Sequence, residues 1–408
     1  MLYRFGLLIV LVVLFQLYSF QCIRTLTQNK IVWTLYCLIV FVIISYISYS
    51  VINYDRASGF NHSISYSIGL FFALFIFQSL IILGLLIEDI YRVPQAIYTF
   101  FTDESKQSET FFPQRRKILS QILFLLASIP FGAILYGMIR GKYNFKVLKY
   151  DILYDDLPKS FDGFTITQIS DIHCGSFDNP QKVEYGLDLV NKQKSDVILF
   201  TGDIVNNTSE ELYPWKKLLS KLKAKNGVYS VLGNHDYGDY MDWKSEKDKI
   251  NNFENLKKLQ KEIGFKLLLN ENDFIKRGNS RIAIIGVENW GVGRFKKAGN
   301  LNKALNGVTA KDFKILMTHD PSHWEAEVIP HKYFFQLTLS GHTHGMQFGI
   351  EIPGIIKWSP IKWRYPQFAG LYKKAKQYLN VNRGFGYLAY PGRVGMWPEI
   401  TVITLKKA

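Results

Sequence analysis

Long, uninterrupted runs of apolar residues fill the first third of the chain. They cover residues 5–22, 31–52, 64–87 and 119–139, and a helix needs roughly 20 such residues to cross a bilayer. Charged residues are confined to the ends of these runs and the stretches between them. A buried bundle of a soluble protein is the alternative, but it does not explain this confinement. We therefore predict a transmembrane region over residues 1–141 with four helices.

The residues that flank the apolar runs indicate whether the first helix is retained and which way the region is oriented in the membrane. Arg4 precedes the first run, but no small-residue cleavage site follows it, so we expect a retained helix and not a signal peptide. Four crossings place the N-terminus and the second half on one side, and the Lys/Arg distribution favours the side outside the cytoplasm. Residues 88–117 mix aromatic and cationic side chains, which suits either an interfacial stretch or a solvated loop.

The pattern changes after residue 141 into short runs rich in β-branched and aromatic residues. "FTITQISDIH", "DVILFTGDIV", "GVYSVLGNHD", "KILMTHDP" and "FQLTLSGHTH" each begin as a strand and end in polar residues. Helix-like stretches at residues 181–194 and 209–223 lie between several of them. Alternation of this kind predicts an α/β domain whose sheets are covered by helices. We assign residues 142–160 to a linker and residues 161–408 to this domain.

Acidic and imidazole side chains recur where these predicted strands end. The recurring residues are Asp171, His173, Asp203, Asn234, His235, Asp236, His319, His342 and His344. Each alone is typical of a turn or of an ordinary surface or core position. In five ordered clusters at strand ends, where α/β folds carry their chemistry, they indicate a site.

Seven of these side chains form a ligand set of carboxylate, amide and imidazole groups without thiolate. Such a set suits Mn²⁺, Fe²⁺ or Zn²⁺, and seven ligands are too many for one ion. They predict two divalent ions with one carboxylate between them. The glycines beside His342 and His344 leave room for the metals and let the backbone turn sharply. The three cysteines form no CxxC pair, so a cysteine-based zinc site is not expected.

The segments "SDIHCG", "TGDIVNN", "GNHDYGDY", "THDP" and "SGHTHGMQ" resemble the five motifs of the calcineurin-like metallophosphoesterases. The resemblance extends over residues 164–405 and implies a four-layer αββα sandwich with a dinuclear metal site. It implies one ion held by Asp171, His173, Asp203 and His344. It implies a second ion held by Asp203, Asn234, His319 and His342. His235 is then the histidine that stabilises the transition state or protonates the leaving group, and Asp236 the residue that orients His235.

Two residues close to the proposed ligands, Met346 and Cys174, are not part of the ligand set. Met346 stands where this branch usually has a second glycine, and its side chain could narrow the site without removing a ligand. Cys174 follows His173 directly, and we expect a buried small hydrophobe there in preference to a further ligand.

The charge of the chain and its membrane region narrow the classes of possible substrate. The net charge of +15 indicates an anionic partner, and Arg383 and Arg393 are candidate phosphate contacts. Residues 353–372 interleave aromatic and cationic side chains, as a membrane interface or a packed loop would. The branch resembles enzymes that hydrolyse UDP-2,3-diacylglucosamine in lipid A synthesis, which implies a lipid-linked phosphodiester or pyrophosphate.

Two other functions stay open from the sequence. One is a phosphodiesterase or nuclease that acts on nucleotides or envelope polymers, although four membrane crossings and the lack of a nucleic-acid module argue against nucleic acid. The other is a non-catalytic membrane scaffold, which the presence of every ligand position argues against. A lipid substrate that carries a nucleotide would be met in the cytoplasm, and this conflicts with the orientation that the Lys/Arg distribution favours.

Overall fold

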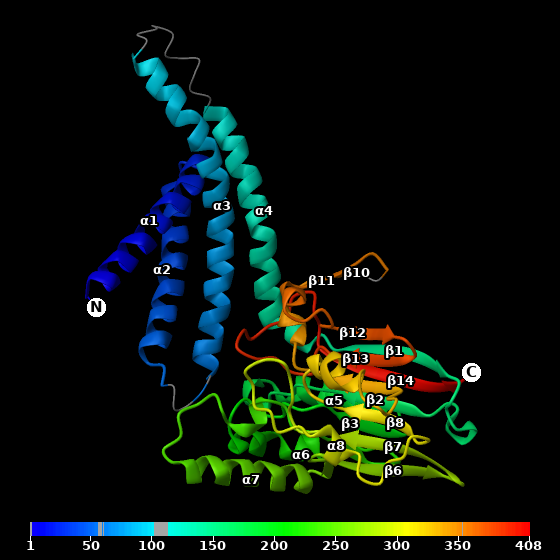
Figure 1. The fold of residues 1–408 in the computed structure, drawn as a ribbon. Helices are drawn as coiled ribbons and strands as arrows, with labels where there is room; N and C mark the ends of the chain where they lie inside the picture. The colour runs from blue at the N-terminus through cyan, green and yellow to red at the C-terminus, as the bar shows by residue number, and fades with distance from the viewer. Residues whose placement is uncertain (1, 56–58, 60, 102–112, 353) are drawn as a thin grey trace. The chain divides into compact units, whose positions relative to one another are not determined.

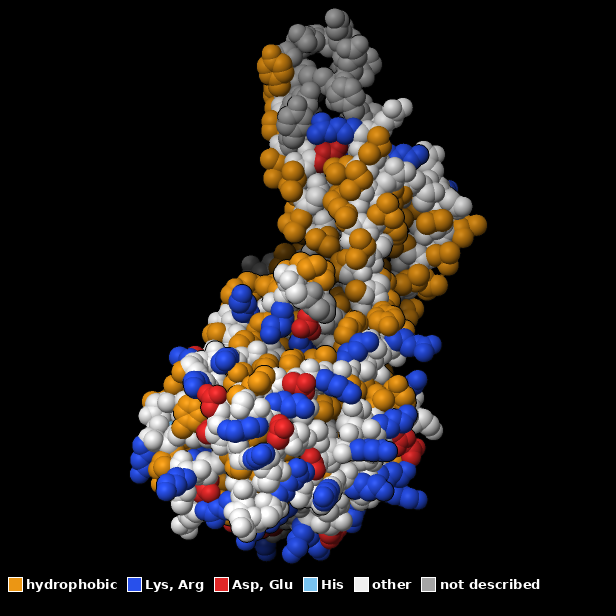
Figure 2. Space-filling model, turned by 90° about the vertical axis from the view of Figure 1, so that its right-hand side faces the viewer, with side chains coloured by type: hydrophobic (Ala, Val, Ile, Leu, Met, Phe, Trp, Pro, Cys, Tyr) orange, Lys and Arg blue, Asp and Glu red, His pale blue; other side chains and the backbone are white. Residues whose placement is uncertain are grey.

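The computed structural model describes residues 2–55, 59, 61–101, 113–352 and 354–408. The chain divides into two compact units (Figure 1). The first comprises Met1–Tyr54 and Tyr66–Tyr136, and the second comprises Asp55–Ser65 and Gly137–Ala408. On the face drawn in Figure 2 the first unit shows mainly hydrophobic side chains, whereas the second shows many Lys and Arg side chains.

In the described residues the first unit is built from four helices, of which the third and fourth each extend at one end into the second unit. They are α1 (Leu2–Leu26), α2 (Lys30–Ile52), α3 (His62–Phe101) and α4 (Pro113–Ile139). Within the described residues, Lys30–Ile52, His62–Pro94 and Gln114–Ile139 are long and apolar enough to span a membrane, and Val10–Leu26 is a shorter apolar helix. Several apolar helices are thus confirmed, while the fourth span stays a prediction. Small and apolar side chains from three of them pack together: Cys22, Phe77, Ile81, Leu85 and Ala127.

The prediction of a loop over residues 88–117 is wrong where the structure describes it, while an interfacial stretch there stays a prediction. Helix α3 continues to Phe101 and α4 begins at Pro113, with residues 102–112 outside the described part. The charges that end the apolar run are paired between the helices, since Arg116 Nη1 lies 3.0 Å from Glu88 Oε2. Because Glu88 and Asp89 are paired with Arg116, the helices extend past the apolar pattern.

The second unit contains two six-stranded mixed sheets and one separate two-stranded hairpin. The first sheet has the order β1 (Lys146–Tyr154), β14 (Glu399–Lys407), β2 (Thr165–Ile169), β3 (Val197–Phe200), β4 (Val228–Ser230) and β5 (Phe265–Leu267). The second has the order β12 (Gly370–Lys374), β13 (Gln377–Val381), β9 (Leu337–Ser340), β8 (Phe313–Met317), β7 (Ser280–Gly286) and β6 (Glu271–Arg277). Strands β2 to β5 are parallel, as are β13, β9, β8 and β7.

The two sheets face each other across an apolar core, and helices cover their outer faces. Ile166 and Leu199 of the first sheet meet Ile284 and Leu339 of the second in this core. Helices α5 (Pro180–Lys192), α6 (Lys216–Leu219) and α7 (Glu246–Glu262) cover the first sheet. Helix α8 (Leu301–Ala304) and the π-helical turn Trp324–Val328 cover the second. The predicted α/β sandwich with four layers is confirmed.

Strand β1 falls within residues 142–160, which the sequence analysis assigned to a linker. It pairs in parallel with β14 along its whole length and forms the edge of the first sheet. The segment "KVLKYDILY" mixes polar and apolar residues, and polar residues are tolerated on an edge strand because part of it meets solvent. This part of the linker therefore belongs to the sandwich.

Candidate metal centre

The predicted site residues stand at the carboxyl ends of parallel strands from both sheets. Asp171 and His173 follow β2, Asp203 follows β3, and Asn234 follows β4. His319 follows β8, and the pair His342 and His344 follows β9. Parallel strands end at a common edge, so the two facing sheets place all five clusters at one end of the sandwich.

The backbone at these positions is strained. Asp171, His173, Asp203, His342 and His344 all have positive φ, between 47° and 71°. Left-handed backbone costs a non-glycine residue about 1 kcal/mol or more, and such residues gather at functional sites. The surrounding sandwich holds five of them within one site, which indicates that their side-chain positions are constrained by function.

Gly341 shows why glycines accompany the two histidines. A Cβ built on it would overlap Ser170 Oγ and Asp171 Oδ2. Gly233 is equally confined, since a Cβ built on it would overlap Asp203 Oδ1. The main chain thus approaches the acidic side chains so closely that no other residue fits.

We expect Gly341→Ala to destabilise the protein by about 1–3 kcal/mol, because an added methyl group has no room. The shifted Asp171 carboxylate should also lower the metal affinity of the chain. A thermal denaturation curve and a Mn²⁺ titration measure the two effects. Gly132→Ala is the control, since a Cβ there has nothing within 4 Å, and an equal effect of both substitutions would contradict this explanation.

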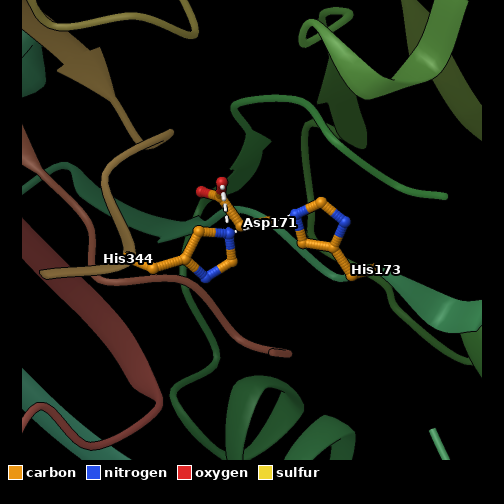
Figure 3. Close-up of side chains that lie close together, drawn as sticks. All are labelled: Asp171, His173 and His344. Carbon is orange, nitrogen blue, oxygen red and sulfur yellow. Dashed lines mark hydrogen bonds and ion pairs between the residues drawn. The ribbon is translucent and has the colours of Figure 1, made fainter. Parts of the chain in front are cut away.

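Asp171, His173 and His344 form the first of two ligand groups (Figure 3). His173 Nε2 lies 3.0 Å from His344 Nε2, and His344 Nε2 lies 3.2 Å from Asp171 Oδ1. All three side chains are buried. One carboxylate oxygen and two imidazole nitrogens converge here, as the ligands of a cation do.

Asp203, His319 and His342 form the second group. His319 Nε2 lies 3.0 Å from Asp203 Oδ2 and 3.3 Å from His342 Nδ1. The same oxygen of Asp203 lies 3.6 Å from His173 Nε2 of the first group. Asp203 therefore faces both groups, which fits the carboxylate that the sequence analysis expected between two ions.

Asn234 supports a cation on independent grounds. Its amide nitrogen donates to the Tyr240 hydroxyl over 2.8 Å, which fixes the amide orientation. Its buried Oδ1 has no hydrogen-bond partner within the described part of the chain. A buried acceptor without a partner is costly, and a metal ion would supply the missing one. The donor set and this oxygen fit two divalent ions.

Neighbouring groups select which imidazole nitrogen faces each ligand group. Nδ1 of His173 lies 3.1 Å from Asn206 Oδ1, and Nδ1 of His319 lies 2.8 Å from the Thr201 carbonyl oxygen. In both rings Nδ1–H donates outward and Nε2 is left to bind a metal. His342 is reversed: its Nε2 lies 2.9 Å from the Tyr365 hydroxyl, and its Nδ1 faces His319.

Sequence reasoning missed Asn206, Thr201 and Tyr365. Asn206 and Thr201 both lie within the "TGDIVNN" motif, and the polar side chain of Asn206 close to Asp203 was a usable signal, whereas Thr201 acts through its backbone carbonyl oxygen. Tyr365 is 23 residues from His342, and only the fold brings the two together.

Asn206→Ala should lower metal affinity by about 10–100-fold, the usual effect of losing an outer hydrogen-bond partner of a metal-bound histidine. The backbone carbonyl of residue 206, which contacts His235 Nδ1, is retained in this variant. Mn²⁺ titration of metal-stripped protein measures the change, with Asn226→Ala as a control away from the site. Unchanged affinity would show that Asn206 does not orient His173.

His235 lies beside the ligands without belonging to either group. Its backbone N–H donates to Asp203 Oδ1 over 2.8 Å, and its Nδ1 lies 2.8 Å from the Asn206 carbonyl oxygen. Its ring meets that of His173 edge-on, with centroids 5.0 Å apart. The ring is thus held through Nδ1 by the Asn206 carbonyl oxygen.

In the described part of the chain the hydrogen bonds of the Asp236 carboxylate do not include the His235 ring, so a direct orienting role for Asp236 stays a prediction. The Asp236 carboxylate instead accepts from the backbone N–H groups of Asp203, Ile204 and Gly233 over 2.8–2.9 Å. It joins the turns after β3 and β4 and so positions the Asp203 backbone. Adjacency in sequence suggested a direct contact, but successive residues of this turn point in different directions.

The pKa values of the buried Asp and His side chains indicate which of them are ionised in the site. Burial lowers the pKa of His319, but the Asp203 carboxylate outweighs this effect and raises it to about 10. Burial favours the neutral form of Asp171, yet His344 and His319 hold the pKa of this carboxyl below its usual range. Burial lowers the pKa of His342 to about 4. Burial and the Asp203 charge raise the pKa of Asp236 to about 7. Positive charge therefore stabilises the ionised carboxylates at the centre of the site.

The structure gives Arg383 and Arg393 partners within the protein. Arg383 is buried and pairs with the carboxylates of Glu399 and Glu351. Arg393 is fully buried, and its guanidinium donates to the carbonyl oxygens of Gly386, Met396 and Arg383. Both arginines thus support the loops around the site, and their role as phosphate contacts stays a prediction.

Met346 and Cys174 differ in their surroundings. Cys174 is buried with apolar neighbours, which raises the pKa of its thiol well above its usual value, and it belongs to neither ligand group. Met346 has φ of 55°, a conformation in which glycine is usual, and its side chain is 53% exposed. No ligand is displaced by it.

Comparisons with known proteins agree with this geometry. The family profile described as "Calcineurin-like phosphoesterase" matches residues 164–346, and the profile "Probable Calcineurin-like phosphoesterase, transmembrane domain" matches residues 2–142. The chain is 32% identical over 253 residues to "Uncharacterized metallophosphoesterase YkuE" of Bacillus subtilis, covering 61% of this chain and 82% of that protein. It is 28% identical over 304 residues to "Transmembrane protein with metallophosphoesterase domain" of Danio rerio, covering 72% of this chain and 63% of that protein.

Proposed function

Since the chain belongs to the calcineurin-like metallophosphoesterase family, we propose that it hydrolyses a phosphodiester or pyrophosphate bond with two divalent ions. It is a multi-pass transmembrane protein and a metal-dependent hydrolase of phosphate compounds. The position of Asp203 between the two ligand groups is the observation that supports a dinuclear site most strongly.

The two ions would divide the ligands as the family resemblance implies. Asp171, His173, Asp203 and His344 would hold one, and Asp203, Asn234, His319 and His342 the other. When bound, such a pair lowers the pKa of a shared water and neutralises charge on the phosphate. Mn²⁺, Fe²⁺ and Zn²⁺ all suit this donor set.

The remaining chemistry falls to residues that are not ligands. His235 is fixed through Nδ1, so its Nε2 is open to a phosphate or leaving-group oxygen. There it would stabilise the transition state or protonate the leaving group. The backbone N–H of His235 meanwhile holds the carboxylate of Asp203 in place.

The proposed substrate is lipid-linked, with UDP-2,3-diacylglucosamine as the example that the family resemblance suggests. Apolar helices in the same chain keep the enzyme where such lipids are found, which supports this class. The Lys/Arg distribution favours an enzyme domain outside the cytoplasm, and an envelope lipid would fit that side better than a nucleotide lipid.

A substrate comparison tests the proposal. Detergent-purified full-length protein with Mn²⁺ would be given bis-p-nitrophenyl phosphate, p-nitrophenyl phosphate, UDP-2,3-diacylglucosamine and a dinucleotide. Mn²⁺-dependent release of UMP from the lipid would support a lipid pyrophosphatase. Turnover of the simple diester without the nucleotide lipid would exclude that substrate and direct the search to envelope lipids. Preference for the dinucleotide would replace the lipid proposal with a nucleotide phosphodiesterase.

A further inference from the structure

A hairpin next to the metal centre exposes large apolar side chains. Strands β10 (Ile350–Ile352) and β11 (Ile356–Trp358) form it, and it projects from the sandwich in Figure 1. Ile355 is 81% exposed, and Trp363, in the 3₁₀ turn Pro360–Trp363 that follows, is 82% exposed. Together with their exposed neighbours they form the hairpin patch: Met346, Ile350, Ile352, Ile355, Ile356 and Trp363.

The hairpin has no sheet to support it. Strand β10 pairs with β11 alone, and this pair joins neither six-stranded sheet in the described part of the chain. A lone two-stranded hairpin is marginally stable in water. Its exposed isoleucines would gain from an apolar environment, and exposed apolar side chains gathered in one short segment mark a surface that meets another apolar body.

Both ends of the hairpin segment are tied to metal ligands. At its start the turn His344–Gln347 leads directly from His344, and the Ser359 hydroxyl donates to the Gly345 carbonyl over 2.9 Å. At its end the Tyr365 hydroxyl lies 2.9 Å from His342 Nε2. The patch is therefore at the rim of the candidate metal centre.

The base of the hairpin is also tied to the end of an apolar helix. Gly349 N–H donates to the Val394 carbonyl over 2.9 Å, and Val394 N–H donates to the Gln347 carbonyl over 2.8 Å. The neighbouring Arg393 N–H donates to the carbonyl of Gly137, 3.3 Å away. Gly137 lies in the last turn of α4, within the candidate span Gln114–Ile139, and belongs to the same compact unit as the hairpin.

The residues around the patch suit the boundary between lipid and water. Trp363 contacts Trp358 edge-on, with centroids 6.1 Å apart. Lys362 and Arg364 flank Trp363 and are exposed, and the Arg364 guanidinium lies 5.8 Å from the Tyr365 ring centroid. Tryptophan with adjacent cations is typical of the headgroup region, where cations meet anionic phosphates.

We propose that the hairpin patch inserts into the interfacial layer of the bilayer that α4 spans. The metal centre then meets its substrate in the plane of the membrane, with Lys362 and Arg364 at the level of the lipid phosphates. The delivery of substrate rests on the lipid-linked function proposed above, whereas the insertion itself does not.

Fluorescence in lipid nanodiscs tests the insertion. Ile355→Cys would be made in a Cys37→Ser background and labelled with an NBD fluorophore, since the two other cysteines are buried. We expect blue-shifted emission that lipids with a shallow doxyl group quench. Ile250→Cys on α7 is the matched control, an isoleucine 53% exposed that should report a water-like environment. Identical emission and quenching at both positions would overturn the proposal.

A second variant tests delivery separately. Ile355→Ser with Trp363→Ser should lower turnover of a diester lipid in nanodiscs roughly tenfold, because apolar burial is lost. Turnover of soluble bis-p-nitrophenyl phosphate should stay within about twofold, which shows that the metal centre is intact. Equal lipid turnover would overturn the role in delivery. A wild-type chain that cleaves the soluble diester but no lipid would defeat the lipid-linked function, and the quenching result would still decide insertion.

Discussion

Asp203→Ala should abolish nearly all hydrolysis of bis-p-nitrophenyl phosphate by the full-length protein. The carboxylate faces His319 at 3.0 Å and His173 at 3.6 Å, and it accepts the backbone N–H of His235. Its loss would remove the carboxylate that faces both ligand groups and the acceptor that holds His235. We expect kcat to fall by about 10³-fold or more, equivalent to roughly 4 kcal/mol of transition-state stabilisation.

The control is Asp188→Ala, which removes an exposed carboxylate from α5. It should leave kcat unchanged within about twofold, since surface substitutions away from a site are nearly neutral. Metal analysis of Asp203→Ala should show lowered occupancy. Full activity in this variant would mean that the two ligand groups do not work together.

His235→Ala should lower kcat by about 10²–10⁴-fold, the range for loss of a group that moves a proton in the transition state. Because His235 belongs to neither ligand group, metal content should equal that of the wild type. KM should change little if the ring acts mainly in the transition state. Steady-state kinetics together with metal analysis of the same preparation separates these effects.

His331→Ala is the matched control, because that histidine contacts Asn302 away from the metal centre. It should retain wild-type kcat. A loss of metal in His235→Ala would assign a structural role to His235, and an unchanged kcat would remove it from the reaction.

The sequence predicts those parts of this protein that depend on local patterns. Apolar runs mark the helices, and short strands that end in Asp or His mark the edge where both ligand groups assemble. The order of the motifs also indicates which residues meet, because parallel strands bring their carboxyl ends together.

Features that depend on tertiary partners were not predictable in this way. The charges at Glu88 and Asp89 suggested the end of a helix, but Arg116 of α4 pairs with them and the helix continues. Arg383 and Arg393 had the chemistry of phosphate ligands, yet buried carboxylates and carbonyl oxygens occupy them. Asp236 stood next to His235, but the turn directs its carboxylate to the backbone.

Edge strand β1 was also not predictable from its local sequence. Its polar residues resembled a linker because only pairing with β14, some 250 residues later in the chain, gives it a place in the sheet. Long-range pairing of this kind leaves little trace in a local pattern.

Counting metal ions against turnover in one preparation is the most direct test of the dinuclear site. Metal-stripped full-length protein would be titrated with Mn²⁺ while bound metal per chain and hydrolysis of bis-p-nitrophenyl phosphate are followed together. We predict no turnover without metal and maximal turnover when two ions are bound per chain. Turnover by the stripped protein, or full activity with one ion per chain, would contradict the site described here.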